Sequence, residues 1–291
     1  MNKRAELLAD LPIDLPAELA TTSTFAEVGR SHPHESAHLH VAGSAPYTDD
    51  LPELAGTLHA ALGLSPVAHG LIEAIDLDLI RKLPGVVDVF SAQHIPGPNE
   101  CGSLVKDDPI LAGEAGDTLR YLGQPVFAVV ASSREDARRA AAQARAAIRV
   151  SVLPPILTPE AAHAAQQYVV PPMHLSRGDA RAAIETAPHR LKARFDVGGQ
   201  EQFYLEGQIA YAIPQEDGCL WVHSSTQHPS EMQHLVAQAL GLRSHQVRVE
   251  CRRMGGGFGG KETQPALPAC AAAIAARHTG HPVRRWRMAR E

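Results

Sequence analysis

The sequence lacks the patterns that mark several large classes of protein. No apolar run approaches the ~18 residues of a membrane-spanning helix. The first residues form no apolar core of signal-peptide length, because Asp10, Asp14 and Glu18 interrupt them. Basic residues are not in excess, since 27 Lys and Arg stand against 32 Asp and Glu for a net charge of −5. This balance disfavours nucleic-acid or membrane binding, and we expect a cytoplasmic protein.

Cysteine is also scarce. The four cysteines lie far apart and form no C-x-x-C pair, which favours reduced packing thiols over a disulfide or zinc framework. What the chain does contain is an ordinary globular composition, with 44% hydrophobic and 20% charged residues over 291 positions. This composition excludes disordered and fibrous classes, and the length suits roughly two domains. The 16 histidines prompt a search for metal or acid–base sites.

Hydrophobic patterning predicts an α+β fold in two parts. The run at 125–131 is apolar throughout, which is typical of a buried strand, and a helix over 134–148 follows a capping box at Ser132 and Glu135. Further strands are expected at 57–64, 86–90, 149–153, 190–197, 209–213, 220–224, 247–250 and from 282. Further helices are expected at 77–83, 231–240 and 266–277.

Proline pairs at 154–155 and 171–172 mark a connection between the two parts. We therefore divide the chain into a polar tail, a first domain, a linker and a second domain. Their predicted boundaries are 1–26, 27–153, 154–188 and 189–291.

His34-Glu35-Ser36-Ala37-His38 matches the H-E-x-x-H motif of zinc hydrolases. In that motif a stable helix places both histidines on one face, and the glutamate activates the metal-bound water. Pro33 and Gly43 leave room for about two turns without an apolar stripe. The alternative is an extended segment whose polar side chains form local hydrogen bonds.

The glycine-rich stretch 255–260 fits two nucleotide-binding motifs incompletely. As G-x-G-x-x-G, it lacks the acidic residue expected about 20 positions later and the rest of a β-α-β unit. As G-x-x-x-x-G-K, it carries Glu262 where a P-loop has the Ser or Thr that holds Mg²⁺. Five glycines around Phe258 instead favour close approach of the backbone to a large ligand over a simple flexible turn.

Several segments together resemble one enzyme family. Residues 252–264 (RRMGGGFGGKETQ) resemble the glycine loop of the molybdenum-binding subunit of xanthine dehydrogenase. The likeness continues, in family order, at 33–37, 41–43, 47–52, 96–100, 122–126, 198–206 and 225–229. It covers residue 27 to the end of the sequence, which makes the H-E-x-x-H match a coincidence.

The resemblance implies both architecture and reaction. Residues 27–153 would form an α/β-hammerhead domain, and 189–291 would begin a molybdopterin-binding domain. The family hydroxylates hypoxanthine and xanthine with oxygen from water, and passes electrons through iron–sulfur clusters and FAD to NAD. The resemblance further implies that the 2Fe-2S clusters and FAD lie on a partner subunit of a hetero-oligomer, which fits a chain without a cysteine cluster for iron–sulfur ligation.

The resemblance also assigns residues around the molybdenum–molybdopterin cofactor. Gln227 is similar to the residue that hydrogen-bonds a molybdenum oxo ligand, for which an amide donor is suited. Gly257, Phe258 and Gly259 resemble the loop beside the molybdenum. Glu262 resembles the glutamate that orients the purine, and it favours a purine enzyme over the related aldehyde oxidases. Ordinary helix-start roles are the alternatives for Gln227 and Glu262.

The general base and further substrate contacts of the family have no counterpart in residues 1–291. We therefore expect a truncated or split subunit that does not hydroxylate purines alone. A non-catalytic assembly or binding module with a hammerhead docking surface is an alternative of another class. A zinc hydrolase using His34, Glu35 and His38 is the third hypothesis.

Overall fold

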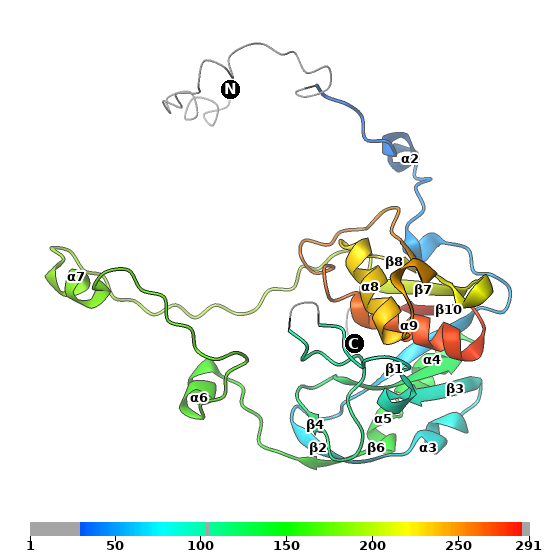
Figure 1. The fold of residues 1–291 in the computed structure, drawn as a ribbon, viewed down its shortest axis with the longest axis horizontal. Coiled ribbons are helices and arrows are strands. Elements are labelled where there is room, and N and C mark those ends of the chain that lie inside the picture. The colour runs from blue at the N-terminus through cyan, green and yellow to red at the C-terminus, as the bar shows by residue number, and fades with distance from the viewer. Residues whose placement is uncertain (1–29, 103–104, 287–291) are drawn as a thin grey trace. The chain divides into compact units, whose positions relative to one another are not determined.

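The computed structural model describes residues 30–102 and 105–286, which form two compact units divided between Ala45 and Pro46 (Figure 1). The predicted tail, 1–26, lies outside the described residues. In the first unit the helix α2 (Ala37–Val41) begins after His34, so the H-E-x-x-H motif does not place both of its histidines on one helix. Nδ1 of His34 accepts the backbone N–H of Ser36 at 3.1 Å. The motif therefore forms a local hydrogen bond in place of the helical face that a zinc hydrolase needs.

The second unit is built on a seven-stranded sheet. In spatial order its strands are β3 (Val86–Ser91), β5 (Pro125–Ala131), β1 (Leu58–Leu64), β10 (Val283–Trp286), β7 (Ile209–Pro214), β8 (Leu220–Ser224) and β9 (Val247–Glu250). β10 lies in the middle, parallel to β1 and antiparallel to β7. The sheet therefore runs through both predicted domains, whose boundaries stay a prediction.

A smaller sheet and three short helices complete the part before residue 153. The sheet has the order β4 (Thr118–Leu119), β2 (Gly70–Ile75) and β6 (Ile148–Val152), of which β2 and β4 were not predicted. The helices are α3 (Leu77–Arg81), α4 (Arg134–Ala141) and α5 (Ala144–Ala147). The single helix predicted over 134–148 is therefore wrong. The cap is also one residue later than predicted, because Oγ of Ser133 accepts the N–H of Asp136 at 3.1 Å.

β5 explains why its sequence is apolar at every position. Ala128 and Val130 belong to the core that includes residues of α8 (Pro229–Ala239) and α9 (Ala266–Thr279). Phe127, Val129 and Ala131 belong to the opposite core, which includes residues of α3, α4 and α5. A strand that is buried on both faces needs apolar side chains at odd and even positions alike.

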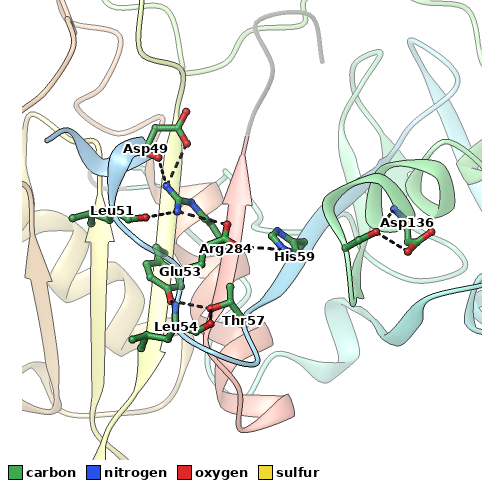
Figure 2. Close-up of polar contacts among 10 residues, drawn as sticks. Asp49, Leu51, Glu53, Leu54, Thr57, His59, Asp136 and Arg284 are labelled. Atoms are coloured by element: carbon green, nitrogen blue, oxygen red, sulfur yellow. Dashed lines mark hydrogen bonds and ion pairs between the residues drawn. The ribbon is translucent and has the colours of Figure 1, made fainter.

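Arg284 ties the middle strand to the segment before β1. Its guanidinium group donates to the carbonyl oxygens of Leu51 at 2.7 Å and Thr48 at 3.0 Å. It also pairs with the carboxylate of Asp49 at 3.3 Å, and Figure 2 shows this group reaching out from β10. Charge-assisted hydrogen bonds from the Arg284 side chain, which is only 3% exposed, and its ion pair with Glu53 at 3.6 Å hold residues 48–53 against the sheet.

Residues 153–205 are mostly exposed and contain the short helices α6 (Pro159–Ala164) and α7 (Ala180–Thr186). The strand predicted at 190–197 is wrong, because these residues join neither described sheet. Leu191 is 94% exposed and Phe195 is 84% exposed. Alternation supplies an apolar face, but a stable strand also needs a neighbouring edge. Within the described residues, no helix has the length and apolar character needed to span a membrane.

Candidate functional site

Three segments meet at the end of the large sheet where β8 and β9 finish, which we call the sheet edge below. β8 and β9 are parallel and are joined by α8, so the turns that follow them lie next to each other. β7 is antiparallel to β8, with Ala210 opposite Ser224, which brings the residues before β7 to the same edge. In open α/β sheets, ligands bind in the crevice beyond the carboxyl ends of parallel strands. This edge is therefore the place to search for a site.

Gln227 lies in the turn between β8 and α8, and its side chain holds the next turn in place. Its Oε1 accepts the backbone N–H groups of Gly259 at 3.0 Å and Lys261 at 3.2 Å. Since both partners are donors, the atom facing them must be the amide oxygen. The Nε2 group is therefore left as a donor on an exposed side chain.

The glycine loop, residues 255–261, follows β9 and adopts a backbone that few sequences allow. Phe258 has φ +52° and is 75% exposed, an unusual state for a bulky aromatic residue. A Cβ atom at position 257 would lie 2.6 Å from Oε1 of Gln227, and one at 260 would lie 2.7 Å from the ring of Tyr204. The glycines at 257 and 260 are therefore required by close approach. Strained backbone held by its surroundings is common at ligand sites.

A buried ion pair supports the glycine loop and was not predicted from the sequence. Nζ of Lys261 lies 3.2 Å from Oε2 of Glu206, with side-chain exposures of 0% and 9%. The same ammonium donates to Oγ of Ser225 at 2.7 Å and lies 4.6 Å from the centre of the Tyr204 ring. Burial lowers the pKa of Lys261, and the charge of Glu206 opposes that shift. In a P-loop this lysine would reach phosphates, so its burial removes the nucleotide interpretation.

The structure brings three of the predicted site residues together, Gln227, Gly257 and Gly259, through the contacts described above. The other two, Phe258 and Glu262, have exposed side chains. Glu262 follows the loop and has an exposed side chain, available to a ligand. It does not lie in the first turn of α9, which begins only at Ala266, so the helix-start alternative does not apply.

The arrangement fits a pterin-bound metal more readily than a metal held by side chains. Among the described residues, no group of three or more His, Cys, Asp or Glu is arranged to hold a metal ion. Instead, the N–H₂ group of the Gln227 amide, which donates to no residue that the structure describes, lies beside a loop with little side-chain bulk. Such a surface can donate to oxo or phosphate oxygens while the backbone approaches a broad, flat ligand.

Two family models match consecutive parts of the chain. Residues 42–150 match the a/b hammerhead domain of aldehyde oxidase and xanthine dehydrogenase. Residues 162–291 match the molybdopterin cofactor-binding domain, which contains the site. The predicted fold class, a hammerhead domain followed by part of a molybdopterin-binding domain, is confirmed.

Individual relatives agree. The chain is 36% identical to xanthine dehydrogenase/oxidase of Gallus gallus over 91% of its length, and 33% identical to aldehyde oxidase 3 of Rattus norvegicus over 97%. These matches span 20% and 21% of the relatives, so the chain corresponds to about a fifth of their length.

Among solved structures, the aldehyde oxidoreductase of Desulfovibrio gigas superposes with a TM-score of 0.72 at 28% identity. That match covers 89% of this chain and 30% of the other. The chain thus belongs to the aldehyde oxidase and xanthine dehydrogenase family, of which it carries the hammerhead domain and part of the molybdenum-binding region.

Proposed function

We propose that this chain provides the cofactor-facing loops of a xanthine dehydrogenase-type enzyme that hydroxylates purines. The observation that carries the proposal is the orientation of Gln227, whose oxygen accepts from Gly259 and Lys261 while its N–H₂ group donates to none of the described residues. When bound, a molybdopterin would supply the two-electron redox chemistry of the hydroxylation. Gln227 would donate a hydrogen bond to an oxo ligand of the metal, and Gly257, Phe258 and Gly259 would lie against the cofactor.

For the substrate class, the proposal rests on Glu262, which resembles the glutamate that orients the purine in the family. Its exposed carboxylate can accept a hydrogen bond from a ring N–H and so orient a purine. The balanced reaction converts a purine C–H bond and water into the hydroxylated purine, two electrons and two protons, and NAD⁺ takes both electrons and one proton. Hypoxanthine and xanthine are therefore the proposed substrates, and a Glu262→Gln variant would be expected to favour aldehydes relative to purines.

The electron path requires iron–sulfur clusters, and no group of three or more His, Cys, Asp or Glu among the described residues is arranged to hold a metal ion. We propose that 2Fe-2S clusters and FAD belong to a partner subunit in a cytoplasmic hetero-oligomer. We further propose that this chain does not turn over purines even with that partner, because the sequence offers no counterpart of the family's general base. To test the lack of turnover, the chain is expressed with an iron–sulfur and FAD subunit, and xanthine-dependent NAD⁺ reduction is assayed. Robust turnover would contradict it.

Gln227→Glu is the sharpest test of the cofactor site. The carboxylate keeps an oxygen for Gly259 and Lys261 but has no N–H₂ group for the ligand. We expect a melting temperature close to wild type and at least tenfold less molybdenum per chain after dialysis. Gln227→Ala, as a control, loses both the accepting oxygen and the N–H₂ group. It should therefore lower both the melting temperature and the molybdenum content.

Molybdenum content also separates this proposal from its alternative. A wild-type chain that is produced in a cell making molybdopterin and binds stoichiometric molybdenum supports a cofactor-binding role. A folded chain without molybdenum would contradict that role and favour a non-catalytic assembly module that docks through its hammerhead domain.

A further inference from the structure

One carboxylate oxygen closes the glycine loop at both ends. Oε2 of Glu206 accepts the N–H of Gly255, the first residue of the loop, at 2.9 Å. It also pairs with the ammonium group of Lys261, the last residue, at 3.2 Å. The hydroxyl of Ser225, two residues before Gln227, donates to the same oxygen. Three donors from two turns of the sheet edge therefore converge on a single atom.

Lys261 connects this carboxylate to Gln227 through its own backbone. Its N–H donates to Oε1 of Gln227 at 3.2 Å, and its carbonyl accepts the backbone N–H of Gln227 at 2.7 Å. Both backbone groups of one residue thus contact Gln227 while its side chain is fixed in the interior. A shift of the Lys261 ammonium would be transmitted directly to the amide that faces the ligand.

The environment leaves the ammonium few other positions. Ser225 accepts from it at 2.7 Å and Glu206 lies at 3.2 Å, while the Tyr204 ring centre lies 4.6 Å away, so three neighbours surround the ammonium group. Glu206 is less completely satisfied. Its Oε1 is buried and has no hydrogen-bond partner among the described residues. Since removal of one member of a buried pair leaves an uncompensated charge, neither residue can be replaced alone without a large loss of stability.

We infer that Glu206 and Lys261 are positioning residues, which close the glycine loop and thereby aim the N–H₂ group of Gln227. The inference depends on the proposed function in one respect, namely that the ligand of this N–H₂ group is the molybdenum cofactor. Neither side chain is assigned a contact with substrate or cofactor. A pair that served the fold alone would be replaceable by a neutral pair, whereas a positioning pair would not.

The experiment compares Glu206→Gln, Lys261→Met and the double variant, made in the full chain. The single variants should melt at lower temperature, and the double variant should recover most of that loss because no unpaired charge remains buried. Hydrogen exchange at the backbone amides of positions 259 and 261 reports the Gln227 contacts without any cofactor. In the double variant we expect both amides to exchange at least tenfold faster than in wild type, with at least tenfold less molybdenum retained.

A matched control uses the exposed pair of Glu73 and Arg149, which lie 3.1 Å apart on neighbouring strands. Glu73→Gln with Arg149→Met should change neither exchange at 259 and 261 nor molybdenum retention. A folded double variant at 206 and 261 with wild-type amide exchange overturns the inference. If the wild-type chain holds no molybdenum, the proposed function fails, and amide exchange alone then decides the role of the pair.

Discussion

Gly257→Ala tests the close contact between the glycine loop and Gln227. The new Cβ atom would lie 2.6 Å from Oε1 and 2.9 Å from Cδ of Gln227, and 2.9 Å from the terminal methyl group of Met254, so the amide and that methyl group must both move. Its two hydrogen bonds, at 3.0 Å to Gly259 and 3.2 Å to Lys261, have little room to lengthen. Two neutral hydrogen bonds together contribute about 2 kcal/mol. That loss corresponds to a melting temperature lower by about 4–8 °C, and to about 30-fold weaker binding of a ligand that needs the aligned amide.

The assay combines thermal unfolding with hydrogen exchange at the amides of positions 259 and 261. Gly259→Ala is the matched control, because no atom lies within 4 Å of its Cβ position although its φ is +86°. That substitution strains the backbone by about 1–2 kcal/mol, but it does not collide with Gln227. We expect Gly257→Ala, and not Gly259→Ala, to remove protection at position 261. Wild-type protection in a folded Gly257→Ala protein would refute the contact-based reasoning.

Three other measurements test the interior of the fold. Phe127→Ala removes a fully buried aromatic ring from β5 and should lower the free energy of unfolding by about 3–5 kcal/mol. A large fall in the urea midpoint of unfolding would show this loss. Burial lowers the pKa of His223 in the folded protein. As the pH falls below 6.5, the unfolded chain therefore binds a proton at this position before the folded protein does, and stability decreases. His223→Asn should flatten the dependence of melting temperature on pH below 6.5, and an unchanged slope would contradict this origin. Burial raises the pKa of the Cys270 thiol to about 12, so a thiol reagent at pH 8 should label the half-buried Cys219 first and Cys270 only after unfolding.

The sequence predicted the elements whose signals are local. The apolar run at 125–131 became β5 because strands buried on both faces have no polar positions. The helix predicted at 266–277 became α9, which ends at Gly280 in the left-handed conformation that glycine favours. By contrast, the alternating residues 190–197 formed no strand, since alternation does not provide a partner edge.

The residues that we propose to face the ligand stand out in the sequence, whereas the residues that support them do not. Gln227 and the loop around Phe258 stand out as motifs, whereas Lys261 looked like the end of a P-loop. Its burial depends on Glu206, which lies 55 residues earlier in the chain and reaches it only through the order of β7, β8 and β9. A charged residue gives no sequence signal of burial when its partner is so distant, because most such residues are exposed.

The position of β10 has a consequence for how the protein is made. β1 and β7 each expose an unpaired edge until residues 283–286 have left the ribosome, and β10 then pairs with β1, which lies more than 200 residues earlier in the chain. Such long-range closure slows folding, and open edges invite pairing with other chains. Nascent chains released before β10 should therefore aggregate, and chaperones that shield sheet edges during translation should raise the yield of folded protein.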